Sequence, residues 1–235
     1  MGGRRDGPAR PGTIAIDGPV ASGKTSIGKE LARRLGYLFL DTGLLYRALA
    51  RLALQTATPL DDGAGLAALA RAADIDVLAA PEPVGYTVRA AGRDITGELQ
   101  GPEVDAAASA VSAHGDVRAA LLPVQRRVGR RGNVVMVGRD VGTVVLPEAD
   151  LKIYLDAPAE VRARRRWLER KRLGRTEDYE RVLAGVIARD ARDSSRAAAP
   201  LSVAADAVVV DTGGLDFGEV LDHLLELVAL WPGTP

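Results

Sequence analysis

The chain has 235 residues, which is enough for one sizeable α/β domain with an insertion and too few for two full domains. Basic and acidic residues number 31 each, and this zero net charge argues against a general nucleic-acid or membrane binder. Cysteine is absent, which excludes disulfides, thiol nucleophiles and thiolate metal sites.

The first segment, Met1–Gly12, is basic and rich in glycine and proline, and it lacks the apolar stretch of a secretory signal. We expect it to be a disordered leader. No later stretch approaches the roughly 20 consecutive apolar residues of a membrane helix. We therefore expect a cytoplasmic protein.

A glycine-rich loop lies between a predicted strand, Thr13–Ile16, and a predicted helix, Ser26–Leu35. Residues 18–25 read Gly-Pro-Val-Ala-Ser-Gly-Lys-Thr, which fits the pattern Gly-x4-Gly-Lys-Ser/Thr. In a strand–loop–helix context this pattern indicates a phosphate-binding loop, whose amides point inward at the positive end of the helix dipole. Lys24 would reach the outer phosphates of a nucleotide, and the Thr25 hydroxyl would bind Mg2+.

The other predicted strands of the core are short, apolar and bounded by Gly, Pro, Asp or charged residues, as strands buried on both faces are. They are Phe39–Leu40, Asn133–Val137, Leu151–Leu155 and Ala207–Val210. Predicted helices separate them: Leu44–Thr56, Val104–Val128, Ala159–Lys171, Tyr179–Arg192 and Phe217–Leu230. This alternation predicts a doubly wound α/β fold, in which a parallel sheet is flanked by helices.

The segment Asp74–Ile95 departs from this alternation. Three short β segments are predicted in it, at Asp76–Ala79, Tyr86–Ala90 and Arg93–Ile95, separated by Pro81-Glu-Pro83 and Gly92. Such short spacings favour an antiparallel meander, inserted into the core.

Three motifs place arginine beside hydroxyl or carboxylate groups. The first, residues 41–47, reads Asp-Thr-Gly-Leu-Leu-Tyr-Arg, and the second, residues 137–143, follows a predicted strand at the end where ligands bind in open α/β sheets. In the third, Arg189, Asp193 and Arg196 have i, i+4, i+7 spacing, which puts them on one helix face if the helix extends that far.

A fourth group of basic residues lies on a predicted helix and the loop after it: Arg162, Arg164, Arg165, Arg166, Arg170, Lys171, Arg172 and Arg175. Any single arginine here is most simply a solvated surface residue. The density of the group nevertheless indicates that at least two of these arginines bind anions. Guanidinium groups that close over phosphates are what phosphoryl transfer requires, since its barrier falls through positioning and charge neutralisation.

With these motifs in order, the chain resembles the bacterial cytidylate kinases over nearly its full length, from about Thr13 to Leu230. The motifs that carry the resemblance are Ile16-Asp-Gly-Pro with Ser-Gly-Lys, Leu40-Asp-Thr-Gly-Leu-Leu-Tyr-Arg, Gly138-Arg-Asp-Val-Gly-Thr-Val-Val-Leu-Pro-Glu-Ala, Lys152-Ile-Tyr-Leu-Asp-Ala and Arg189-Asp-Ala-Arg-Asp-Ser-Ser-Arg-Ala-Ala-Ala-Pro-Leu. The resemblance implies transfer of the γ-phosphoryl group of ATP to CMP or dCMP with Mg2+. It also implies one kinase domain at 13–230, with an acceptor-binding insertion at about 42–115, a helical arginine-rich lid at about 160–178 and a tail at 231–235.

The resemblance also implies roles for individual residues. The residues that would bind ATP are Gly18, Pro19, Val20, Ala21, Ser22, Gly23, Lys24, Thr25 and Ser26, with Thr25 on the metal. Those that would assist transfer are Lys24, Arg139, Arg162, Arg165 and Arg166. The acceptor monophosphate would meet Arg47 and Arg139, the cytosine would meet Thr42, Arg118, Asp140 and Arg196, and the ribose would meet Ser109, Arg189 and Asp193. The expected partners are these small molecules alone, with no nucleic acid or membrane, and we expect a monomer.

Two alternatives stay open at this point. One is a kinase of another small acceptor, such as shikimate or a different monophosphate. The other is a non-catalytic ATP-binding regulatory module, because a fold alone does not fix a function. The choice between CMP and dCMP is also open.

Overall fold

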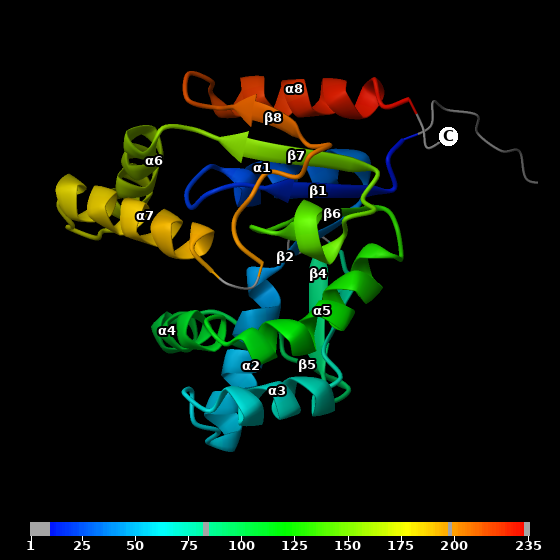
Figure 1. The fold of residues 1–235 in the computed structure, drawn as a ribbon, viewed down its shortest axis with the longest axis vertical. Helices are drawn as coiled ribbons and strands as arrows, with labels where there is room; N and C mark the ends of the chain where they lie inside the picture. Colours follow the sequence, from blue (N-terminus) through cyan, green and yellow to red (C-terminus); the bar gives the residue numbers. More distant parts are fainter. Residues whose placement is uncertain (1–9, 82–84, 197–198, 233–235) are drawn as a thin grey trace, which may run out of the picture.

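The computed structural model describes residues 10–81, 85–196 and 199–232, and it confirms the predicted α/β fold. Five parallel strands form the central sheet in the order β2-β6-β1-β7-β8 (Figure 1). They are β1 (Thr13–Asp17), β2 (Leu38–Asp41), β6 (Val134–Val137), β7 (Leu151–Asp156) and β8 (Val208–Asp211). Each differs from its predicted bounds by a single residue at one or both ends.

Side chains alternate between the two faces of β1, as strand geometry requires. Ile14 and Ile16 pack with the helices α1 (Lys24–Leu35) and α8 (Phe217–Ala229) in one apolar cluster. Ala15 belongs to a second cluster on the opposite face of the sheet. Because both faces are buried, the strands are continuously apolar rather than alternating.

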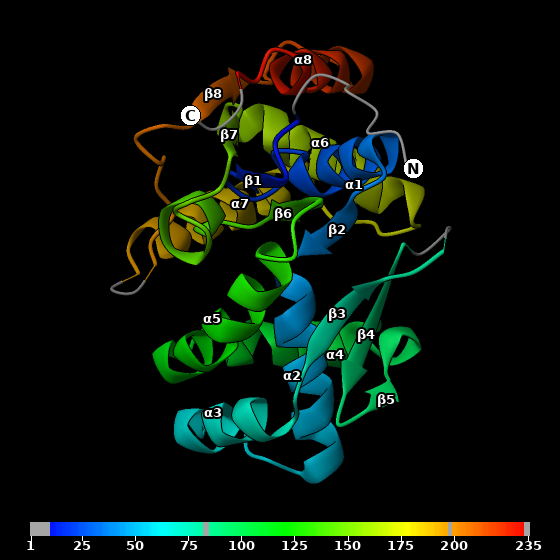
Figure 2. The same ribbon diagram turned by 90° about the vertical axis from the view of Figure 1, so that its right-hand side faces the viewer.

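The chain between β2 and β6 forms a peripheral body that lies beside the sheet (Figures 1 and 2). Its elements are α2 (Gly43–Thr56), α3 (Gly63–Ala72), β3 (Asp76–Ala79), β4 (Tyr86–Ala90), β5 (Arg93–Asp94), the 3-10 turn η1 (Thr96–Glu98), α4 (Pro102–Val111) and α5 (Gly115–Gly129). The predicted meander is confirmed, since β3, β4 and β5 form an antiparallel sheet in that order. The connection between β3 and β4 contains residues 82–84, which lie outside the described residues. Helix α5 packs against α3 and in this way belongs to the same body.

Two predictions in the peripheral body are wrong. The single helix expected at Val104–Val128 is two helices, because the chain leaves the helical path at His114, where the backbone is extended. The ring Nε2 of His114 lies 2.9 Å from the carbonyl oxygen of Leu60, which holds this break against the chain before α3. Helix α3 itself is absent from the predicted elements. The Asp62 carboxylate caps its first turn by accepting from the Gly65 amide.

The helices α6 (Ala159–Arg172) and α7 (Tyr179–Ser194) pack against each other beyond the carboxyl end of β7 (Figure 1). Val20, in the glycine-rich loop, joins Val182 and Val186 of α7 in a small apolar cluster with α6. Apolar burial therefore holds the helix pair against the loop.

The two ends of the chain are described only in part, since residues 1–9 of the expected leader and 233–235 of the expected tail lie outside the described residues. The Gly12 carbonyl accepts from the Val134 amide at 3.0 Å, so contacts with the core begin before the first strand. Within the described ranges, no helix combines the length and the apolar character needed to cross a bilayer.

Gly28 determines how closely α1 approaches the sheet. A Cβ atom here would lie 2.6 Å from Cγ1 of Val137 and 3.2 Å from Cε2 of Phe39. We predict that Gly28→Ala lowers the free energy of unfolding in urea by about 1–3 kcal/mol through overpacking. Gly185→Ala on α7 is the matched control, because its Cβ would meet no described neighbour within 4 Å and should stabilise the helix by about 0.5–1 kcal/mol. Equal stability of the two variants would contradict the prediction.

Candidate active site

The glycine-rich loop leaves the carboxyl end of β1, where Gly18 has a φ of 154°. A Cβ atom on Gly18 would lie 2.2 Å from the carbonyl oxygen of Leu155, so no other residue fits without displacing β7. Gly23, with a φ of 90°, ends the loop and precedes α1. The loop residues predicted to bind phosphate, Gly18, Pro19, Val20, Ala21, Ser22 and Gly23, therefore wrap around the start of α1, which continues through Lys24, Thr25 and Ser26.

Lys24 is buried and is the first residue of α1, and its Nζ donates to the carbonyl of Pro19 at 2.9 Å. Burial lowers its pKa, with a further lowering from Arg139, whereas Asp41, Asp17 and Asp193 oppose that shift. A phosphate group beside Nζ would stabilise the charged ammonium in this buried position.

Thr25 and Asp41 lie together at the carboxyl ends of β1 and β2. The Thr25 hydroxyl donates to Oδ2 of Asp41 at 2.9 Å, and Oδ1 of Asp41 accepts from the Gly43 amide at 2.9 Å. A hydroxyl beside a carboxylate fits Mg2+, which is commonly held by one or two protein oxygens together with substrate phosphates. Sequence reasoning named Thr25 alone. The position of Asp41 at the end of a strand was the available signal.

Asp193 is the centre of an arginine cluster. Its side chain is only 1% exposed, and it pairs with Nε of Arg139 at 2.9 Å, with Arg196, and with Nε of Arg189 at 3.8 Å. Arg139 comes from the segment after β6, whereas Arg189 and Arg196 come from α7 and the residue stretch after it. The three side chains meet, but not on one helix face as predicted, because α7 ends at Ser194 and Arg196 lies beyond it.

A second buried pair lies beside this cluster. Nη2 of Arg118, on α5, donates to Oδ2 of Asp140 at 2.7 Å, and both side chains are mostly buried. Burial raises the pKa of Asp140, while Arg118 opposes this most strongly, followed by Arg196 and Arg139. The ring of Tyr46 lies under the Arg118 guanidinium, 5.9 Å from its central carbon. An ion pair and an aromatic ring thus lie next to one another here.

Three residues predicted to bind the acceptor belong neither to the cluster around Asp193 nor to the Arg118–Asp140 pair. The Thr42 hydroxyl is buried and donates to the carbonyl of Val137 at 3.1 Å, which leaves it able to accept but not to donate to a ligand. Arg47 pairs with Asp105 of α4 and is not bonded to the arginine cluster. Ser109 is exposed on α4, and its hydroxyl has no partner in the described part of the chain.

The three predicted lid arginines occupy three different environments. Arg162 is buried: it donates to the carbonyls of Ala157 and Val20 and pairs with Asp190 at 2.7 Å, so it holds the loop backbone. Arg165 points to the outer edge of the sheet and donates to Thr212 and Leu215.

Arg166 lies near enough to Arg189 of the arginine cluster for the two charges to repel each other. Its pKa is lowered by burial first and then by Arg170 and Arg189. It has no ion-pair partner among residues 10–81, 85–196 and 199–232. Of the three, it is the one best placed to receive an anion.

Asp17 is a further buried carboxylate that sequence reasoning missed. Its Oδ1 accepts from the Val141 amide at 2.8 Å and its Oδ2 from the Gly142 amide at 2.7 Å. These amides begin η2 (Val141–Val145), a π-helical turn after β6. Burial raises the pKa of Asp17 to about 6, and the two amides oppose the shift.

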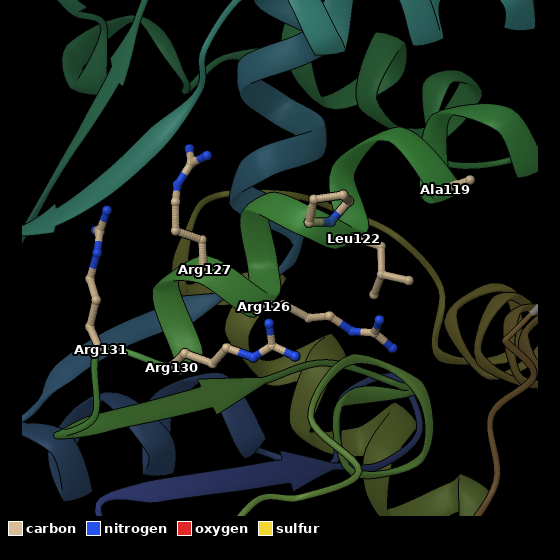
Figure 3. A pocket seen from close by; sticks show the side chains of 7 residues that line it. Ala119, Leu122, Arg126, Arg127, Arg130 and Arg131 are labelled. Carbon is tan, nitrogen blue, oxygen red and sulfur yellow. The ribbon is translucent and has the colours of Figure 1, made fainter.

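A groove beside α5 contains four arginines, none of which is a predicted site residue (Figure 3). Its lining residues are Ala119, Leu122, Pro123, Arg126, Arg127, Arg130 and Arg131. Three of the arginines donate to backbone carbonyls: Arg126 to those of η2, Arg127 to Ile75 and Arg131 to Val77. These arginines therefore bind protein segments together and are already engaged.

Known proteins resemble this chain closely in sequence. A sequence model of the family described as cytidylate kinase matches residues 14–230. A cytidylate kinase of Herpetosiphon aurantiacus is 47% identical over 222 residues, which cover 94% of this chain and 95% of that protein. A cytidylate kinase of Nocardia farcinica is 44% identical over 220 residues, which cover 93% and 94%. The solved shikimate kinase of Bacteroides thetaiotaomicron aligns with 92% of this chain at 15% identity and a TM-score of 0.47.

Asp193 neutralises several guanidinium groups at once. We predict that Asp193→Asn lowers the free energy of unfolding by about 1.5–3 kcal/mol, because it leaves partly buried guanidinium groups without their shared counterion. Sulfate should restore more of the melting temperature in this variant than it adds to the wild type, since it can replace the carboxylate. Asp222→Asn on the exposed face of α8 is the control and should change stability by less than about 0.5 kcal/mol. A loss below about 1 kcal/mol for Asp193→Asn would refute the role.

Proposed function

Since this chain belongs to the cytidylate kinase family, we propose that it transfers the γ-phosphoryl group of ATP to CMP or dCMP, giving ADP and CDP or dCDP. An oxygen of the acceptor phosphate attacks the γ-phosphorus, and the bond from that phosphorus to the β–γ bridging oxygen breaks. No covalent intermediate on the protein is needed. We further propose a monomeric cytoplasmic enzyme that has no nucleic-acid or membrane partner.

The observation that supports this acceptor is the buried Asp140–Arg118 pair beside the arginine cluster. Cytosine presents an amine donor beside a ring acceptor, so a carboxylate and a guanidinium complement its edge. Uracil presents the reverse order on that edge. Arg196 would also face the base, and the remaining lone pairs of the Thr42 hydroxyl can accept from it.

The cluster around Asp193 supplies the charges that an acceptor phosphate needs. Arg139 would bind that phosphate, and Arg189 and Asp193 would approach the ribose. Arg47 and Ser109 lie on the peripheral body, on α2 and α4, and would reach the acceptor when that body closes over the sheet. Such closure excludes water and strengthens each charge interaction.

The donor site follows from the loop and α1. Residues 18–26 would surround the phosphates of ATP, and Thr25 and Asp41 would hold Mg2+, which neutralises charge on the phosphate oxygens. Lys24 would turn from the Pro19 carbonyl to the transferring group. With Arg139 and Arg166 it would stabilise the charge that develops there.

An acceptor panel with ATP and Mg2+ tests the reaction. We expect ADP formation in a coupled assay with CMP and dCMP, and rates at least tenfold lower with AMP, GMP or dTMP. Equal or higher kcat/KM with AMP would overturn the acceptor assignment. ATP binding without transfer to any monophosphate would instead favour a regulatory module.

Asp140→Asn tests base recognition. The amide can donate where the carboxylate can only accept, so we expect kcat/KM for CMP to fall about 10- to 100-fold. The ratio of kcat/KM for UMP to that for CMP should rise. The ratio of the two acceptors is measured on one protein sample, and partial unfolding therefore cannot alter it. The KM for ATP should change less than about twofold. An unchanged UMP-to-CMP ratio would show that Asp140 does not contact the base.

A further inference from the structure

The acceptor motif is tied to the strand that carries the phosphate-binding loop. Arg139 and Asp140 directly precede η2, whose first two amides donate to Asp17 at 2.8 and 2.7 Å. Asp17 directly precedes Gly18 in the chain. The two oxygens of one carboxylate thus connect segments that lie 124 and 125 residues apart.

The position of Asp17 follows from strand alternation. Asp17 and Ala15 lie on the same face of β1, which is the face that meets η2. The side chain is 5% exposed, so its two hydrogen bonds form away from water. Asp140 and Lys24 act on the charge of Asp17, Asp140 raising its pKa and Lys24 lowering it, and neither is hydrogen-bonded to it. A buried carboxylate that accepts two amides fixes both position and orientation of the turn that donates them.

The other end of η2 is held by α5. Arg126 donates from Nη2 to the carbonyl of Val144 at 2.9 Å and from Nε to that of Val145 at 3.1 Å. In Figure 3, the side chain of Arg126 extends away from those of Arg127 and Arg131. A carboxylate at the amide end and a guanidinium at the carbonyl end both match the dipole of the turn.

We propose that Asp17 is a positioning residue for the acceptor: it fixes the Arg139–Asp140 segment relative to the phosphate-binding loop, with Arg126 securing the far end of the same turn. This inference rests on the proposed function. Asp17 itself touches neither substrate. Its effect is therefore expected in acceptor binding and not in donor binding.

Asp17→Asn is the first test. The asparagine offers one oxygen to two amides, so one amide loses its acceptor and the turn loosens. We expect the KM for CMP to rise at least tenfold, while the ATP dissociation constant measured by calorimetry changes less than about twofold. Asp150→Asn is the matched control, because Oδ2 of Asp150 accepts from the Thr13 amide at 2.9 Å, at the opposite end of β1. The control should leave the KM for CMP unchanged.

Arg126→Met tests the same turn from its other end. It replaces Asp17→Asn as the test if that variant folds poorly. Arg126→Met should also raise the KM for CMP severalfold, and the dissociation constant for ATP should stay the same. Arg127→Met is its control, because Arg127 donates from the same helix to Ile75 and not to η2. Equal effects of the two arginine variants would overturn the inference.

Amide hydrogen exchange gives a readout that does not depend on the reaction. The peptide covering residues 138–146 should exchange at least tenfold faster in Asp17→Asn than in the wild type or in Asp150→Asn. If the wild type does not phosphorylate CMP but residues 138–146 still exchange faster in Asp17→Asn, the proposed function is refuted and the positioning role of Asp17 is not. Unchanged exchange, or a fall in kcat at an unchanged KM for CMP, would overturn the inference, the latter by showing that Asp17 acts through Lys24.

Discussion

Mutual repulsion of guanidinium groups is the constraint on which the site depends. Arg139, Arg189 and Arg196 converge on one small volume, and Asp193 lies almost fully buried between them. Without that carboxylate the three groups would separate into solvent. The carboxylate lowers the free energy of the assembled site while leaving an excess of positive charge for a phosphate. One side chain thus holds two segments that are distant in sequence, the end of α7 and the segment after β6.

Apolar packing couples α6 and α7 to the glycine-rich loop. Val20 packs against Val182 and Val186, while Arg162 donates to its carbonyl and Asp190 accepts from its amide at 3.3 Å. Both polar groups of the Val20 backbone are therefore occupied by α6 and α7. A valine here gives these helices an apolar anchor that a small polar side chain would lack. Movement of α6 and α7 would consequently change the shape of the loop.

Local patterns in the sequence predicted the core well. The motif Gly-x4-Gly-Lys-Thr, a β-branched strand before it and a periodic helix after it specify β1, the loop and α1 without any long-range information. The spacing of Arg189 and Asp193 likewise predicted their shared face of α7, whereas Arg196 lies beyond the end of that helix. These features depend on neighbouring residues, and periodicity reports such relations directly.

Features that depend on distant contacts could not be predicted. The break at His114 is supported by the Leu60 carbonyl, and the side chain of Asp17 meets the start of η2 only through the fold. Arg162 and Arg165 belong to the same basic run as Arg166. Their differing partners follow from which side of α6 each occupies, not from their residue type.

The orientation of Arg139 shows why arginine, and not lysine, suits this position. Nε donates to Asp193 at 2.9 Å and Nη1 to the Gly138 carbonyl at 3.2 Å, so two bonds fix the plane of the guanidinium. Nη2 has no acceptor in the described part of the chain. A lysine could satisfy the carboxylate but would have no rigid second edge to present. Because bonds from Nε and Nη1 already fix the guanidinium, Nη2 could donate to an anion at little further entropic cost.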